Sequence, residues 1–290
     1  MACRGRVAYR DAVPQTLVSP DQPRSAVVTG AARGIGRAIA AELVGRGYLV
    51  VVTDLDASAA AATADEIGAH SGAALDVTDP AANRALAARA REIAPLGAWV
   101  CNAGVAFDGD LGDLTDGQVR LSVEVNVLGV AWGARAAADA FREQAAIGVT
   151  GGEIGIVASL SAHAPVPNLS VYAATKAAVL SLATSIASEL RRDGIRVHAV
   201  CPDGVSTAML EGFDANGSTR EILAAGVLLT PDTVARELVA MFGTARVYRT
   251  LPVWRGVVAR SASLAPTLAM RVDPLMRRLG ARRLRRAGLR

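Results

Sequence analysis

Tyr172 and Lys176 are the residues whose types and spacing most directly suggest chemistry. They stand four positions apart in Tyr-Ala-Ala-Thr-Lys, so on a helix both side chains lie on one face. Lys176 is also the only lysine among 31 Lys and Arg residues. A compact ammonium beside a phenol favours the phenolate, lowers the pKa of the phenol and prepares it to accept a proton. The alternative for so short a pattern is a chance pair on the surface of an Ala-rich helix.

A glycine-rich turn lies between a predicted strand and a predicted helix near the start of the chain. The strand covers 25–29, the turn 30–36 contains three glycines, and the helical stretch runs over 37–46. Glycines let the backbone approach a pyrophosphate closely, and the amides at a helix start favour negative charge. The turn therefore predicts a dinucleotide-binding site.

Asp54 directly follows the second predicted strand, which covers 48–53. An acid at this position, roughly 20 residues beyond the glycine turn, can accept both hydroxyls of an adenosine ribose and would repel a 2′-phosphate. Asp54 thus favours NAD over NADP, whereas Arg33 is a counter-signal because it could reach such a phosphate. The alternative role for Asp54 is to cap the helix predicted over 57–67, although Asp56 or Ser58 could do this instead.

Strand and helix signals keep alternating along the chain. Further strands are predicted over 73–75, 98–101, 152–158, 195–200 and 246–252, and further helices over 80–93, 114–142, 170–191 and 231–242. This alternation implies a single doubly wound Rossmann-type α/β domain, with a parallel sheet of about seven strands and helices on both faces.

Asn126 falls among apolar neighbours in one predicted helix. A buried Asn needs hydrogen-bond partners, so it either stabilises the local structure or belongs to a polar relay. Residues 208–230 suit a mobile flap over a site.

The motifs in this order resemble the short-chain dehydrogenase/reductase family over about residues 25 to 252. The matching positions are Thr29-Gly30-x-x-x-Gly34-x-Gly36, Asp54, Asp76-Val77, Asn102-Ala103-Gly104, Asn126, Ser159, Tyr172-x-x-x-Lys176 and Pro202 to Thr207. The 13 positions from Ser159 to Tyr172 are the family's usual spacing. The sequence departs from the family at Asp203, where Gly is usual, and Gly204 can supply the missing flexibility.

The resemblance implies an oxidoreductase that transfers a hydride between NAD(H) and an apolar secondary alcohol or ketone. By this resemblance, Tyr172 would be the general acid/base, and Lys176 would lower its pKa. Ser159, or else Ser161, would hydrogen-bond the reacting oxygen. Asn126 would bind a water that connects to Lys176. The cofactor-binding positions implied are Gly30, Arg33, Gly34, Ile35, Gly36, Asp54, Asp76, Val77, Asn102, Ala103, Gly104, Tyr172, Lys176, Pro202, Val205 and Thr207. The alternative is a catalytically idle relative that binds dinucleotide as a redox sensor or scaffold.

Composition indicates where such a protein would work and with which partners. Three cysteines without metal-ligand spacing predict no metal site and no disulfide framework, and no apolar run reaches the length of a signal-peptide core or a membrane span. A cytoplasmic protein is expected, and by resemblance a homodimer or homotetramer through the Tyr-Lys helix.

The two ends of the chain are set apart from the predicted domain at 25–252. Residues 1–24 read as a loose extension, and 253–290 as a basic amphipathic tail. Residues 246–290 hold 12 arginines and one acid, although the whole chain carries only +4. The tail would contact an anionic membrane surface or pack on a neighbouring subunit. No nucleic-acid binding is expected, because no reading module accompanies the charge.

Overall fold

The computed structural model describes residues 22–164, 166–207 and 228–264, together with positions 267, 271, 278 and 282. Seven strands form one parallel sheet in the order β3-β2-β1-β4-β5-β6-β7. They are β1 (Ser25–Thr29), β2 (Leu49–Asp54), β3 (Ser71–Ala74), β4 (Leu96–Cys101), β5 (Gly152–Val157), β6 (Ile195–Pro202) and β7 (Tyr248–Leu251). The strand order reverses between β1 and β4, where a sheet of this kind offers a crevice for ligands outside its carboxyl ends. The predicted doubly wound fold is confirmed.

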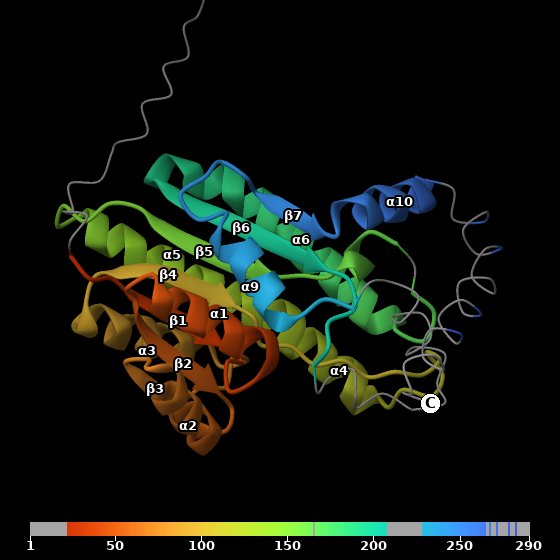
Figure 1. Ribbon diagram of the computed structural model, residues 1–290, viewed down its shortest axis with the longest axis horizontal. Helices are drawn as coiled ribbons and strands as arrows, with labels where there is room; N and C mark the ends of the chain where they lie inside the picture. Colours follow the sequence, from red (N-terminus) through yellow and green to blue (C-terminus); the bar gives the residue numbers. More distant parts are fainter. Residues whose placement is uncertain are drawn as a thin grey trace, which may run out of the picture.

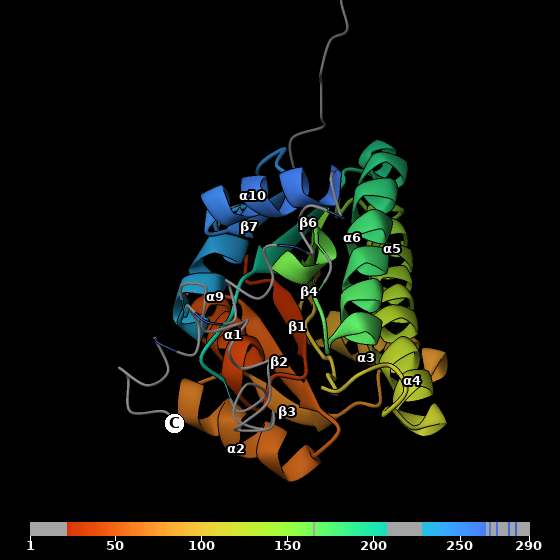
Figure 2. The ribbon, with the colours of Figure 1, turned by 90° about the vertical axis from the view of Figure 1, so that its right-hand side faces the viewer.

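Helices cover both faces of the sheet (Figures 1 and 2). One layer holds α1 (Gly34–Gly45), α2 (Ala57–Ile67) and α9 (Pro231–Val239), and the other holds α3 (Pro80–Ile93), α5 (Val130–Ala145) and α6 (Ser170–Leu190). Successive strand residues feed the two cores alternately: Val27 packs with the α3, α5 and α6 layer and Val28 with the α1 and α9 layer. Strands buried on both faces explain the nearly continuous apolar runs in the sequence.

The long helix predicted over 114–142 is interrupted. It consists of α4 (Asp116–Val123), a π-helical turn η1 (Glu124–Gly129) and α5. Thr115 and Gln118 start α4 with a reciprocal capping box. The π turn contains Asn126, which is fully buried. Such turns are frequent at functional sites, because they shift one side chain relative to the helix on either side.

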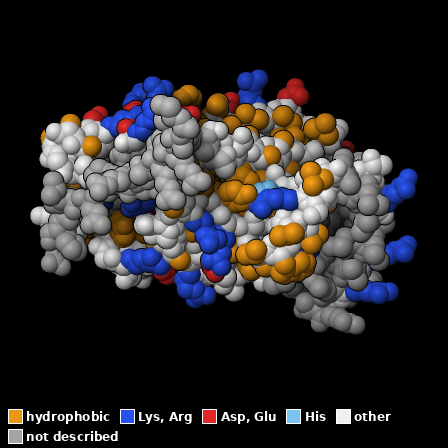
Figure 3. Space-filling view, turned by 90° about the horizontal axis from the view of Figure 1, so that it is seen from above, with side chains coloured by type: hydrophobic (Ala, Val, Ile, Leu, Met, Phe, Trp, Pro, Cys, Tyr) orange, Lys and Arg blue, Asp and Glu red, His pale blue; other side chains and the backbone are white. Residues whose placement is uncertain are grey.

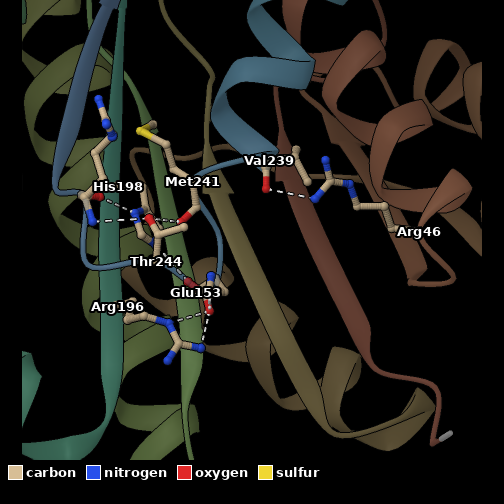
Figure 4. A network of polar contacts seen from close by, with 9 residues as sticks. Arg46, Glu153, Arg196, His198, Val239, Met241 and Thr244 are labelled. Carbon is tan, nitrogen blue, oxygen red and sulfur yellow. Dashed lines mark hydrogen bonds and ion pairs between the residues drawn. The ribbon is translucent and has the colours of Figure 1, made fainter. Parts of the chain in front are cut away.

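A buried polar network ties β5 to β6 and to the segment before β7 (Figure 4). Glu153 Oε1 accepts hydrogen bonds from Arg196 Nε at 2.8 Å and from the backbone N–H of Gly243 at 3.2 Å. Glu153 Oε2 lies 2.8 Å from His198 Nε2. His198 Nδ1 lies 2.6 Å from the carbonyl oxygen of Arg246, so Nδ1 is the donor. The network fixes the start of β7, and with it the helix that follows.

Helix α6 and the turn after it, Ser170–Asp193, are long enough and apolar enough, with mean hydropathy 1.2, to cross a membrane by those two measures. This corrects the expectation that no run reaches spanning length. In the structure, however, α6 packs against β6, α5 and the short helix η2 (Leu160–Ala162). It also buries Thr175 and Lys176 in the fold. One face of α6 therefore packs on the fold.

Candidate functional site

The glycine turn closes tightly against the loop that follows β4. Gly30 has a φ of 61°, and a Cβ there would lie 2.7 Å from the Cα of Ala103. A Cβ on Gly36 would lie 2.4 Å from the carbonyl oxygen of Gly30. Asn102 Nδ2 donates to the carbonyl oxygens of Thr29 at 2.9 Å and Gly30 at 2.8 Å. Only glycine permits this close approach, and Asn102 holds the turn in place.

Helix α1 begins at Gly34, earlier than the predicted 37–46. Its N-cap residue Arg33, which is exposed, makes no side-chain cap bond, and no acid lies in the first turn. A Cβ on Gly34 would lie 3.5 Å from Cγ2 of Thr207, so the loop after β6 faces the start of this helix. Ile35 is partly buried beside them. Uncapped amides at the positive end of a helix dipole suit a pyrophosphate.

Asp54 lies at the end of β2 beside this turn. Its Oδ2 accepts a hydrogen bond from the backbone N–H of Ala32 at 3.2 Å. The cap of α2 is Asp56, whose Oδ1 accepts from the N–H groups of Ser58 and Ala59. The capping role considered for Asp54 is therefore filled by Asp56, and the partly exposed Asp54 carboxylate is left at the crevice.

The loop after β3 places Asp76 and Val77 at the same carboxyl edge. Asp76 Oδ1 accepts from the N–H of Thr78 at 2.9 Å and from its hydroxyl at 2.7 Å. The carbonyl oxygen of Val77 accepts from Asn83 Nδ2 at 3.0 Å. These hydrogen bonds order the loop. Those of Asp76 both use Oδ1, so Oδ2 takes no part in them.

Asn126 pins the loop after β4 to helix α6. Its Oδ1 accepts from the N–H of Val105 at 2.8 Å, and its Nδ2 donates to the carbonyl oxygen of Val105 at 2.8 Å and to Thr175 Oγ1 at 3.1 Å. A Cβ on Gly104 would lie 3.2 Å from Asn126 Oδ1 and 3.6 Å from Lys176 Nζ. The loop, the π turn and the lysine therefore meet at one point.

Tyr172, Lys176 and Ser159 also come together. Lys176 Nζ lies 5.6 Å from the centroid of the Tyr172 ring and donates to the carbonyl oxygen of Val157 at 2.8 Å. Ser159 lies close enough to the Tyr172 hydroxyl to lower the pKa of the phenol. Ser159 Oγ also accepts from the N–H of Ser161, whose own hydroxyl has no hydrogen-bond partner among the described residues. Ser159 is thus the serine that affects the pKa of the phenol.

Burial dominates the acidities in this group. It raises the pKa of Tyr172 to about 12, against the polar influence of Ser159, which lowers it. It lowers the pKa of Lys176 to about 8, against the neighbouring Cys201, which raises it. The net direction for the phenol is opposite to the lowering expected from an adjacent ammonium. The reason is that burial outweighs the other influences while Nζ is bonded to the Val157 carbonyl.

Asp203, where the family usually has Gly, follows Pro202 at the end of β6 and is bound to helix α10 (Val253–Leu264). Its Oδ2 lies 2.9 Å from Arg255 Nε, and both side chains are largely buried. Its backbone N–H donates to the carbonyl oxygen of Leu251 at 2.8 Å. Asp203, the residue that departs from the family pattern, therefore forms an ion pair with Arg255. This pair joins the loop that contains Val205 and Thr207 to α10.

A second contact joins α10 to the segment after Ser159. Arg260 Nη2 and Thr250 Oγ1 each lie 3.3 Å from His163 Nε2, and the Arg260 guanidinium stacks 4.9 Å from the centroid of the Tyr248 ring. Burial, followed by the charge of Arg260, lowers the pKa of His163. The sequence analysis missed Arg255 and Arg260, because no local pattern marks a partner that lies 52 or 97 positions away.

Substituting Asp203 by asparagine should destabilise the fold by about 3 kcal/mol, because a largely buried Arg255 loses its compensating charge. The free energy of unfolding in urea measures this loss. The matched control is Glu66→Gln, which removes one partner of the exposed pair with Arg37 and should cost less than about 1 kcal/mol. Equal losses in the two variants would contradict the structural role of the Asp203 pair.

The fold and site together define a doubly wound α/β protein. It carries a glycine turn where the strand order reverses and a Ser-Tyr-Lys group at the carboxyl edge of the sheet. The family model described as short chain dehydrogenase matches residues 24–217. The chain belongs to this family.

Individual relatives agree with this assignment. The chain is 35% identical over 201 residues to the probable oxidoreductase EphD of Mycobacterium tuberculosis, covering 67% of this chain but 33% of that protein. It thus spans about a third of the length of the first curated relatives that it matches. Sorbitol dehydrogenase of Cereibacter sphaeroides is 36% identical over 205 residues, covering 70% of this chain and 78% of the relative. A short chain dehydrogenase/reductase of Burkholderia phymatum, solved in complex with NAD, is 27% identical, with a TM-score of 0.74, covering 86% of this chain and 95% of that one.

Proposed function

We propose that the protein is an oxidoreductase that transfers a hydride between NAD(H) and an apolar secondary alcohol or ketone. The observation that carries the proposal is the group formed by the Tyr172 phenol, with Lys176 Nζ 5.6 Å from its ring centroid and Ser159 near enough to affect its pKa. This group lies at the same sheet edge as a glycine turn that can accommodate a pyrophosphate. A sorbitol dehydrogenase and an NAD-bound structure among the relatives support the same reaction class.

The chain's own residues would handle the proton and the orientation of the substrate. The nicotinamide, when bound, supplies or accepts the hydride. The Tyr172 hydroxyl would give its proton to a carbonyl oxygen, or take one from an alcohol, while Ser159 holds that oxygen. The Lys176 charge would stabilise the phenolate and bond the nicotinamide ribose. Asn126 would fix the loop at Val105 and accept a hydrogen bond from a water on the path to Lys176.

The dinucleotide would lie across the sheet edge from Asp54 to Thr207. The amides at Gly34, Ile35 and Gly36 would hold the pyrophosphate, with Gly30 and Arg33 beside them. Asp54 would accept the ribose hydroxyls, Asp76 and Val77 would face the adenine, and Asn102, Ala103 and Gly104 would lie along the cofactor. Pro202, Val205 and Thr207 would contact the nicotinamide. Most of the predicted flap, 208–227, lies outside the described residues.

NAD should be preferred over NADP because the Asp54 carboxylate repels a 2′-phosphate. Replacing Asp54 by serine should lower the ratio of the kcat/KM for NAD to the kcat/KM for NADP by at least about tenfold. A tenfold change corresponds to ~1.4 kcal/mol of discrimination between the two cofactors. The control is Asp56→Ser, since that carboxylate caps α2 and a serine can do the same. An unchanged ratio in the Asp54 variant would remove the basis for NAD preference.

The substrate class is tested with a panel of apolar secondary alcohols, their ketones and a polyol such as sorbitol. Each is followed by NADH or NADPH absorbance, with NAD(H) and NADP(H) supplied separately. Turnover of apolar members above the polyol supports the proposal. Tight NADH binding without turnover of any member would favour the idle redox sensor or scaffold instead.

We also propose the assembly, domain limits and location of the protein. The small residues Ala177, Ala178 and Ser181 are exposed on α6 and would allow close packing in a homodimer or homotetramer. The domain would occupy 25–252, between an extension at 1–24 and a tail at 253–290. Cys101 and Cys201 are free and buried, which suits a reducing cytoplasm.

A further inference from the structure

Helix α10 presents an apolar face that no other described element covers. Twelve large hydrophobic side chains are exposed in the described part of the chain, and five of them lie on this one helix. Trp254 is 57% exposed, Val257 58% and Leu264 87%, and Val253 and Val258 are each 56% exposed. Figure 3 shows hydrophobic side chains gathered on the face of the molecule seen from above, with a few basic groups among them. A patch of this kind on one helix marks an interaction surface.

The inner face of the same helix is fixed to the sheet. A Cβ on the buried Gly256 would lie 2.7 Å from Cβ of Thr250, so the helix lies directly on β7. Arg255 pairs with Asp203, and Arg260 contacts His163 and the ring of Tyr248. The exposed residues therefore belong to a helix anchored along its length, so its apolar face keeps a fixed orientation relative to the fold.

The charge of the C-terminal stretch that contains this helix indicates which partner fits the surface. Residues 246–290 contain 12 arginines and one acid, and Arg271, Arg278 and Arg282 are described and exposed. A second copy packed on this face about a two-fold axis would bring the basic C-terminal stretches of the two chains near one another, with like-charge repulsion. An anionic lipid surface instead attracts the arginines, while the apolar residues enter the boundary between headgroups and acyl chains. Tryptophan is enriched at that depth.

We propose that α10 docks the protein on anionic membrane surfaces, with Trp254, Val257 and Val258 inserted. The helix lies parallel to the membrane plane and does not span it. Because α10 contacts both η2 and Asp203, docking brings the carboxyl edge of the sheet close to the lipid. This proposal concerns binding alone and does not depend on the reaction assigned to the site.

The test is sedimentation of the full chain with phosphatidylcholine vesicles, with or without phosphatidylglycerol at about a third of the lipid. The wild type should bind the anionic vesicles at least tenfold more than the neutral ones, and salt should weaken the binding. The triple variant Trp254→Gln, Val257→Gln, Val258→Gln should lose at least fivefold in bound fraction. The matched control carries Leu55→Gln, Leu111→Gln and Ile147→Gln, three exposed positions outside α10, and should bind like the wild type.

NADH binding and the melting temperature are measured on every variant, so that loss of folding is distinguished from loss of docking. Equal binding of the wild type to neutral and anionic vesicles would overturn the proposal. Unchanged binding by the folded triple variant would overturn it as well. A lower oligomeric state of the triple variant in light scattering, without vesicle binding by the wild type, would assign the face to a second copy of the chain.

Discussion

Replacing Tyr172 by phenylalanine should lower turnover by about 10³-fold, within the range of general acid–base catalysis, while NADH binding changes less than about twofold. The ring remains and fills the same space beside Lys176, 5.6 Å from its Nζ. What is lost is the hydroxyl that lies near Ser159 and would exchange a proton with the substrate. The measurements are the rate of ketone reduction at saturating NADH and the dissociation constant of NADH by fluorescence.

Tyr48→Phe is the matched control, because Tyr48 lies at the start of β2 and packs on the core of the α1 and α9 layer, away from Ser159. It should retain wild-type turnover. Comparable activity in the two variants would refute Tyr172 as the acid/base. Loss of NADH binding in Tyr172→Phe would show instead that the phenol mainly holds the cofactor.

Lys176 should impose a pH dependence on ketone reduction. Burial lowers its pKa to about 8, so the amine is charged below that pH and neutral above it. The Tyr172 phenol, with a pKa raised to about 12, stays protonated through the same range and can still donate its proton. The kcat for ketone reduction at saturating NADH should therefore be flat below about pH 8 and fall as the pH rises through it. Lys176→Met should be slower than the wild type by about 10²-fold below pH 8, and the difference should shrink above that pH as the wild-type amine loses its charge.

Lys176→Arg separates the charge from its position. A guanidinium stays charged throughout this range, so the fall near pH 8 should disappear, although the larger group lowers the overall rate. A wild-type profile that is flat through pH 8, or an unchanged fall in the arginine variant, would show that another group titrates. His163 is not that group, because burial and Arg260 lower its pKa below its usual range.

Local pattern accounts for most of what could be anticipated. The parallel sheet follows from alternating apolar runs and helical stretches, and the glycine turn follows from three glycines between a strand and a helix. Asp56 was already a candidate cap for α2, and the structure confirms it. Strand limits were less well defined: β3 covers Ser71–Ala74 rather than 73–75, because side-chain pattern alone does not fix which backbone groups pair.

Short-range pattern is enough to predict the succession of strands and helices, the glycine turn, and the position of Tyr172 and Lys176 on one helix face, because each depends on neighbours within a few positions. The folded arrangement alone sets the π turn at Asn126, the Asp203–Arg255 pair and the contact of Arg260 with His163. It also decided that the pKa of the phenol rises rather than falls. These features depend on burial and on charges brought together from distant parts of the chain, and no local spacing records either.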